Sequence, residues 1–190
     1  METPLKKLFG NLLLLAVVVA VISFFAAPAV AFFGIRSAAD ASDVSGLSRL
    51  IDFTAVRQSL RPQLSGDPAA MAPAPTFLED PIGAVRRQIE QARPAAVDVD
   101  AWLTPAALAA LTRGEGRYAA QRTGAPVPTA NDPVPTPVFW GVNRVRLAVA
   151  DEGGSRTVFT FERKGPFERK LVHIGLPDGS TPPTPAPAAG

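Results

Sequence analysis

With 190 residues, the chain can hold one domain of ordinary size once its terminal segments are set aside. Its formal net charge is only +2, so it lacks the basic excess of a nucleic-acid-binding protein, and we expect no nucleic-acid partner. The absence of cysteine excludes disulfides, zinc sites with thiolate ligands and thiol catalysis.

The N-terminus combines two lysines with a long apolar run. Lys6 and Lys7 precede residues 8–27, LFGNLLLLAVVVAVISFFAA, which carry no charge. A run of about 20 apolar residues is long enough to span a bilayer as a helix. Because positive residues favour the cytoplasmic side, we expect residues 1–7 in the cytoplasm, a single transmembrane anchor at 8–27, and export of everything that follows.

A cleavable signal peptide is the competing interpretation of the same segment. Ala29-Val30-Ala31 is an A-x-A sequence that a signal peptidase could process before Phe32. The apolar run is longer than the ~7–15 residues of a usual signal core, which favours the uncleaved anchor. Both interpretations export the rest of the chain.

Residues 28–64 predict three helices in close succession. The first begins at Pro28, which suits the first turn of a helix, and runs to about Ala41. Ser42-Asp43 and then Asp52 interrupt the pattern with residues that favour N-caps. Pro62 is expected to kink or end the third helix near Leu60. Apolar residues at helical spacing follow each cap: Leu47, Leu50 and Ile51, then Phe53, Val56, Leu60 and Leu64.

Residues 65–114 predict a loop and two further helices. The proline-rich stretch 65–77 has the composition of a loop. Asp80-Pro81 and Thr104-Pro105 each place a capping residue before a proline, which is the signature of a helix start. The second of these helices follows a possible hydrophobic staple formed by Trp102 and Leu103, and Gly114 is expected to take the left-handed position after its end.

Beyond a Gly- and Pro-rich connector at 115–137, the apolar pattern changes from helical to alternating. Alternation at 145–149 and 159–161 indicates two strands, and turns at 151–154 and 164–166 join them to each other and to a third strand at 170–176. The predicted fold is therefore α+β: an N-terminal transmembrane helix, then four or five short helices packed on a three-stranded antiparallel meander, in a domain spanning 28–177. The proline-rich tail, 178–190, is expected to be disordered.

A set of short motifs occurs in a fixed order along the chain. Its residues are Ala39, Asp43 and Leu47; Asp52, Phe53 and Arg57; Asp100, Leu103, Thr104 and Pro105; and Ile174, Leu176 and Pro177. This order resembles an uncharacterised bacterial family, domain of unknown function family 2939 (DUF2939), over about residues 29–177. The chain departs from the family near Arg169, where a tryptophan is expected and Phe167 is the candidate to replace it. The resemblance implies a membrane-anchored protein of the bacterial inner membrane with a periplasmic domain, and it implies no activity.

No group of residues predicts a catalytic, metal or cofactor site. His173 is the only histidine, and it is expected on the outward face of its strand without a partner to position it as a base. Asp98 and Asp100 could act as paired carboxylates, but capping of the helix start near Trp102 is the simpler interpretation. The bases of the sheet region leave two possibilities, a contact with anionic lipid headgroups or the favoured solvated face of mixed charge. They are Arg144, Arg146, Arg156, Arg163, Lys164, Arg169 and Lys170.

We therefore expect a non-enzymatic, membrane-anchored domain that binds an envelope protein or supports the envelope. The alternative is a small-molecule or lipid-binding module with an apolar pocket between the helices and the sheet. The aromatic residues that would line this pocket, or else fill the core, are Trp102, Trp140, Phe159 and Phe161.

Overall fold

The computed structural model describes residues 4–65, 98–129, 132–151, 153–166 and 168–177. Its helices are α1 (Pro4–Asp40), α2 (Val44–Leu50), α3 (Phe53–Leu64) and α5 (Pro105–Thr112), with the 3-10 helices η2 (Asp100–Leu103) and η3 (Gly116–Gln121). The strands are β1 (Thr136–Trp140), β2 (Arg144–Ala150), β3 (Arg156–Arg163) and β4 (Arg169–Gly175). The predicted helix start at 80–81, the tail at 178–190, the substitute residue Phe167 and nearly all of the predicted loop at 65–77 lie outside the described residues.

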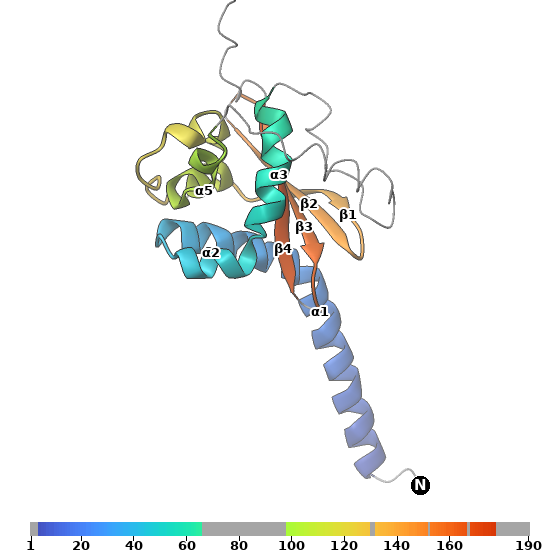
Figure 1. The fold of residues 1–190 in the computed structure, drawn as a ribbon. Helices are drawn as coiled ribbons and strands as arrows, with labels where there is room; N and C mark the ends of the chain where they lie inside the picture. Colours follow the sequence, from blue (N-terminus) through green and yellow to red (C-terminus); the bar gives the residue numbers. More distant parts are fainter. Residues whose placement is uncertain (1–3, 66–97, 130–131, 152, 167, 178–190) are drawn as a thin grey trace, which may run out of the picture.

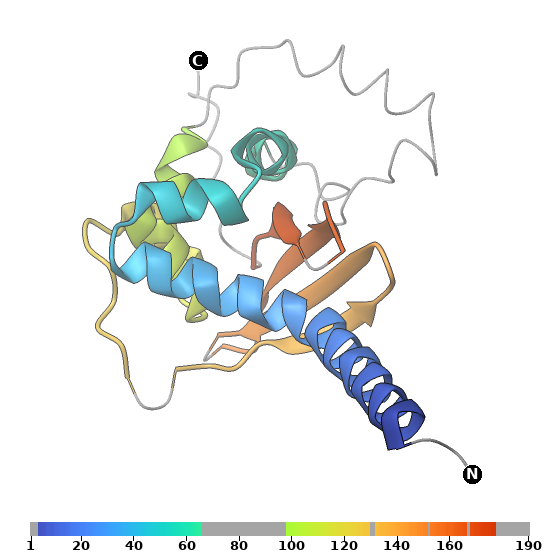
Figure 2. The same cartoon turned by 90° about the horizontal axis from the view of Figure 1, so that it is seen from below.

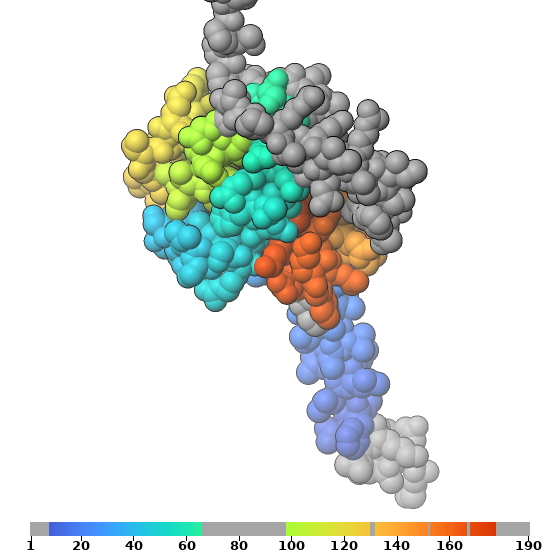
Figure 3. Space-filling view, viewed as in Figure 1, coloured from blue at the N-terminus to red at the C-terminus, as the bar shows by residue number. Residues whose placement is uncertain are grey.

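Helix α1 is one continuous helix with two environments. Its N-terminal part projects from the rest of the molecule with exposed apolar side chains (Figures 1 and 3). Its C-terminal part buries Phe32, Ile35 and Ala39, at the spacing of a helix packed on one side. The expected helix start at Pro28 is wrong, because Pro28 lies inside α1. A proline can bend a helix without ending it where the helical sequence continues on both sides, and Figure 2 shows α1 changing direction along its length.

The predicted N-caps of α2 and α3 are confirmed. Asp43 Oδ1 accepts a hydrogen bond from the Gly46 N–H at 2.9 Å, and Asp52 Oδ1 accepts one from the Ala55 N–H at 3.1 Å. Ser42, just before the first cap, has a φ of 53°, which is where α1 turns sharply into α2. The two caps therefore set the turns between three consecutive helices.

Helix α5 also starts and ends as predicted. Thr104 Oγ1 accepts a hydrogen bond from the Ala107 N–H at 3.1 Å, and Pro105 occupies the first turn. Gly114 has a φ of 81°, and the following N–H, that of Glu115, reaches the Ala110 carbonyl at 3.0 Å. A Cβ atom at position 114 would lie 2.5 Å from the Ala150 carbonyl oxygen, so this helix end requires glycine.

The sheet is antiparallel in the order β1-β2-β3-β4, with four strands where three were predicted. The additional strand, β1, contains Pro137, and its pairing with β2 shifts register between Pro137 and Phe139. Proline cannot donate a hydrogen bond to a neighbouring strand, so a strand that contains one is tolerated at an edge. The same proline-rich composition made the start of β1 resemble a connector, which explains the error.

The core lies between α1, α5 and one face of the sheet. The Phe32 ring of α1 meets the Phe159 ring of β3 edge-to-face, with 5.2 Å between the ring centroids. The predicted inward face of β2 is confirmed, because Val145 and Leu147 pair with Phe161 and Phe159 and all four side chains are buried.

His173 was expected to face outward, and that prediction is wrong, because only 5% of the residue is exposed. The pairing of β3 with β4 shifts register between Thr160 and Phe161, and His173 pairs with Thr160, which is fully buried. The second face of the sheet is therefore covered at this point too. Alternation along one strand assigns a residue to a face but cannot reveal whether that face is covered, because the cover comes from other parts of the chain.

Helix α3 runs beside β4 and closes its outer edge (Figures 1 and 2). The Asp52 N–H donates to the Leu171 carbonyl at 2.9 Å. Near the other end of α3, Gln63 Nε2 donates to the Ile174 carbonyl at 2.8 Å, and Gln63 Oε1 accepts from the Leu176 N–H at 3.0 Å. One buried amide thus occupies two backbone groups that a fifth strand would otherwise pair with.

The expectation that Pro62 ends α3 near Leu60 is wrong, since α3 continues to Leu64. Pro62 lies in the last turn, where its missing donor costs one hydrogen bond at most. Continuation of the helix by these residues is what carries Gln63 to β4. Gln63 also donates to the Ser59 carbonyl at 2.8 Å, which helps to hold the turn around Pro62.

We predict that Gln63→Leu lowers the free energy of unfolding by about 2–4 kcal/mol, because it leaves a carbonyl and an N–H of β4 buried without partners. The control is Gln58→Leu, which changes an exposed glutamine of the same helix and should cost less than about 0.5 kcal/mol. Denaturant titration of the full chain in detergent measures both. Equal losses in the two variants would show that Gln63 does not hold β4.

Candidate functional site

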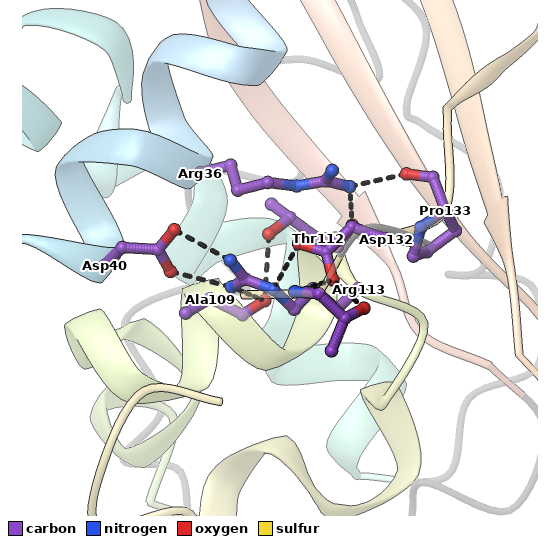
Figure 4. Close-up of polar contacts among 8 residues, drawn as sticks. Arg36, Asp40, Ala109, Thr112, Arg113, Asp132 and Pro133 are labelled. Atoms are coloured by element: carbon purple, nitrogen blue, oxygen red, sulfur yellow. Dashed lines mark hydrogen bonds and ion pairs between the residues drawn. The ribbon is translucent and has the colours of Figure 1, made fainter. Parts of the chain in front are cut away.

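Two arginines and two aspartates from three parts of the chain meet where α1 and α5 end (Figure 4). Arg113 donates from Nη1 and Nη2 to the two carboxylate oxygens of Asp40, each at 2.7 Å. Its Nε donates to Asp132 Oδ2 at 2.8 Å. The Arg113 side chain is only 4% exposed, so a planar guanidinium with two carboxylate partners ties α5 to α1 and to the segment before β1.

Arg36 is the second cation of this cluster. Its Nη2 donates to the Thr112 carbonyl and, at 2.7 Å, to the Pro133 carbonyl. Thr112 is the last residue of α5, where carbonyls without helical partners form the negative end of the helix dipole. The guanidinium carbon also lies 5.2 Å from the centroid of the Phe32 ring. Arg36 therefore joins α1 to the C-terminal end of α5.

Arg113 and its two carboxylates stabilise one another, whereas burial lowers the pKa of Arg36 although the charge of Asp132 opposes this. Hydrogen bonds to Asp40 and Asp132 raise the pKa of Arg113 above its ordinary value, although its desolvation opposes this. Burial alone would raise the pKa of Asp132, but hydrogen bonds from Thr129 and Arg113 outweigh it and hold that pKa below its ordinary value. All of these groups are engaged in pairing, so the cluster acts as a clamp on α1. We call Arg36, Asp40, Arg113 and Asp132 the arginine clamp.

A second contact zone joins α1 to the sheet near the projecting part of the helix. The Trp140 ring at the end of β1 stacks on the Phe25 ring, with 5.9 Å between centroids and 22° between planes. The Arg169 guanidinium at the start of β4 lies 5.4 Å from the Phe24 ring centroid, and its Nη2 donates to the Val142 carbonyl at 3.2 Å. Burial, and secondly the nearby charge of Arg163, lower the pKa of Arg169 from its ordinary value.

The aromatic residues singled out from the sequence do not form one group. Trp102, Phe159 and Phe161 belong to the hydrophobic core. Trp140 lies outside it, 41% exposed, so the interpretation of Trp140 as a core residue is wrong. The physical reason is its position on an edge strand, where no further strand covers its outer side.

The carboxylates singled out from the sequence have local structural roles. Asp98 Oδ1 accepts hydrogen bonds from the N–H groups of Asp100 and Ala101, at 3.1 and 3.3 Å, and so caps η2. Asp100 accepts from Arg57 Nε at 2.7 Å in an exposed ion pair. Among the described residues, no three His, Cys, Asp or Glu side chains gather where they could hold a metal ion.

The arginine clamp was missed at the sequence level, although one signal was present. Arg36 lies four residues after Phe32 and three before Ala39, so the helical repeat places it on the buried face of α1. A charge at such a position needs a partner. The partner groups come from residues 112 and 133, and no local pattern could name them.

We predict that Arg113→Met lowers the free energy of unfolding by about 2–4 kcal/mol, because it leaves two carboxylates without the cation between them. The matched control is Arg122→Met, which removes an arginine paired with Glu115 at the surface and should cost less than about 1 kcal/mol. Thermal and denaturant unfolding of the full chain measure both. A loss no larger at position 113 than at position 122 would contradict the clamp.

Comparison with known proteins matches the chain to a family whose function is unknown. A family model described as "Protein of unknown function (DUF2939)" matches residues 17–111, half of the chain. The match runs from the apolar part of α1 into α5 and includes two of the clamp residues, Arg36 and Asp40, but not Arg113, Asp132 or the sheet. No curated protein and no solved structure matches the chain. The chain therefore belongs to DUF2939, a family of proteins of unknown function.

Proposed function

We propose that the protein is a membrane-anchored, non-enzymatic domain that binds a protein partner or supports the cell envelope. The observation that carries the proposal is the continuity of α1 from an exposed apolar part into the hydrophobic core. From Leu8 to Asp40, this helix is long and apolar enough to cross a membrane, judged by length and composition. A span at residues 8–27 would end only a few residues before Phe32, the first large side chain that α1 buries completely.

The proposed orientation follows from charge. Lys6 and Lys7 precede the apolar run and favour a cytoplasmic N-terminus, which puts the domain on the other side of the membrane. With the family resemblance, this makes the domain periplasmic, on a single-pass protein of the bacterial inner membrane. The arginine clamp and the packing of Phe32 then hold the domain close to the bilayer without a flexible linker.

A role in binding protein is supported by the contrast between the two edges of the sheet. The outer edge of β4 is occupied by α3, whereas all five residues of β1 are exposed. An exposed edge strand presents backbone groups that can pair with an extended segment of another protein. Val138 and Phe139 add apolar surface to this edge.

A non-enzymatic role is supported by the structural use of the candidate groups. Asp98 caps a helix, Asp100 pairs with Arg57, and the clamp carboxylates pair with Arg113. The alternative, a small-molecule or lipid-binding module, has weaker support because Trp140 lies apart from the core that contains the other three aromatic residues.

The anchor is tested by expressing the full chain in bacteria and washing the membranes with carbonate. We expect an unprocessed chain that stays in the membrane fraction. Leu15→Arg should release a large share of the protein, because a charge near the middle of a span costs about 3 kcal/mol. Val44→Arg, at an exposed position of α2, should release none. A soluble product shortened at residue 31 would identify a signal peptide and refute the anchor.

The protein-binding role is tested with a photo-crosslinking amino acid placed in the full chain in cells. At position 138, in the exposed strand β1, we expect a discrete adduct with an envelope protein. Position 127, also an exposed valine but distant from β1 in the sequence, is the control and should give none. If neither position gives a crosslinked adduct, the proposal of a partner at the β1 edge is refuted. The proposal of a role in supporting the envelope then remains.

A further inference from the structure

Two turns of the sheet lie beside the point where α1 leaves the domain. One joins β1 to β2 and follows Trp140, and the other joins β3 to β4 and precedes Arg169. The ring contacts of these two residues are with Phe25 and Phe24, which fall in the last turn of the apolar run at 8–27. This end of the sheet is therefore fixed against the end of the candidate span.

The side chains at this end, most of them exposed or partly exposed, combine apolar groups with bases. We call this set the junction surface: Phe139, Trp140, Val142, Arg144, Arg163, Lys164, Arg169 and Lys170. Phe139 and Trp140 are about half exposed and Val142 is 63% exposed, although all three are large apolar residues. Aromatic side chains with partial exposure are favoured at the level of lipid headgroups, where the ring is apolar and its surroundings are wet.

The charge of the junction surface is positive. Its five bases face two acids, Glu162 and Glu168. Glu162 pairs with Arg144 at 2.9 Å and, at the longer distance of 4.0 Å, with Lys164. Arg163 and Lys164 are exposed at the tip of the β3–β4 turn. Arg169 is only 3% exposed, and its described contacts are the Val142 carbonyl and the Phe24 ring, with no carboxylate among them. A buried charge is screened less than an exposed one, so Arg169 adds to the positive field at this end.

We propose that the junction surface docks on the headgroup layer of an anionic bilayer, with Trp140 and Val142 among the headgroups and Arg163 and Lys164 against lipid phosphates. This rests on the proposed membrane anchor and deepens it by naming anionic lipid as the partner of this surface. The span places the surface at the bilayer, and the opposite charge of the lipid holds it there. Each base near such a surface contributes about a fivefold preference for the docked state.

The experiment uses the absence of cysteine to label single sites in the full chain. Val142→Cys carries a nitroxide on the junction surface, and Val127→Cys, at another exposed valine, is the control. Each protein is reconstituted into vesicles of phosphatidylcholine alone or of phosphatidylcholine mixed with phosphatidylglycerol. Paramagnetic resonance then compares the access of oxygen, which concentrates in lipid, with that of a water-soluble nickel chelate.

At position 142 we expect the ratio of oxygen to chelate access to rise several-fold on adding phosphatidylglycerol, and at position 127 to stay constant. Lys164→Glu should reverse most of the rise. Arg156→Glu, the same change of charge at the opposite end of β3, should leave it intact. A label at 142 that is as accessible to the chelate as the label at 127 in both lipids overturns the docking.

The same vesicles separate failure of the docking from failure of the anchor. A chain that floats with the vesicles after a carbonate wash but keeps position 142 in water is anchored and undocked, which overturns this inference alone. A chain that leaves the vesicles after the wash refutes the anchor and the docking together.

Discussion

The structure depends on one helix, α1, whose two parts have different surroundings: the N-terminal part projects from the domain and the C-terminal part packs in its core. The projecting part of α1 exposes apolar side chains on all sides, whereas its C-terminal part buries one face, which includes the stripe formed by Phe32, Ile35 and Ala39. Burial of each large side chain of this stripe contributes about 2 kcal/mol, so the packed part cannot leave the core without a large loss of stability. The direction of the projecting part relative to the domain is consequently set by packing. A domain on a flexible linker would sample many orientations, but this one has a defined face toward the membrane that we propose.

Three groups of contacts, at successive positions along α1, hold this helix in its orientation relative to the domain. Phe24 and Phe25 meet the end of the sheet, Phe32 meets β3, and Arg36 with Asp40 meets α5. The Phe25 and Trp140 rings are about half exposed, whereas the Arg113 side chain of the clamp is only 4% exposed. Electrostatic interactions are stronger where water is excluded, so the clamp resists rotation of α1 best at the end farthest from the proposed span. The contacts nearest the proposed span involve the Phe24 and Phe25 rings, which a lipid surface does not weaken.

Features that are satisfied locally could be predicted from the sequence. The caps at Asp43, Asp52 and Thr104 each bond a group three residues away, and the turn at Gly114 needs only a positive φ. Features that depend on distant groups could not. Gln63 bonds residues 111 and 113 positions away, Arg113 bonds a carboxylate 73 positions away, and burial of His173 depends on the covering of the second face of the sheet. The strand β1 was missed for a similar reason, since a proline-containing edge becomes a strand only when a neighbour pairs with it.

The motif residues shared with the DUF2939 pattern turn out to be structural. Asp43, Asp52 and Thr104 are caps, and Arg57 of one motif pairs with Asp100 of the next, which ties α3 to η2. In the last motif, the Leu176 N–H is held by Gln63. A signature of this kind specifies how the helices turn around α1 and close the edge of β4.

The surfaces that carry our proposals contain none of these motif residues. Val138 and Trp140 on β1, and Lys164 beyond β3, lie outside every motif and gain their positions from the scaffold that the motifs build. Caps and ion pairs fix the conformation of the backbone, whereas exposed side chains determine which partners a surface can bind. In this protein the fold signature and the proposed interaction surfaces are therefore separate sets of residues. A change in one can leave the other intact, which is why charge reversal at the surface can test binding without unfolding the domain.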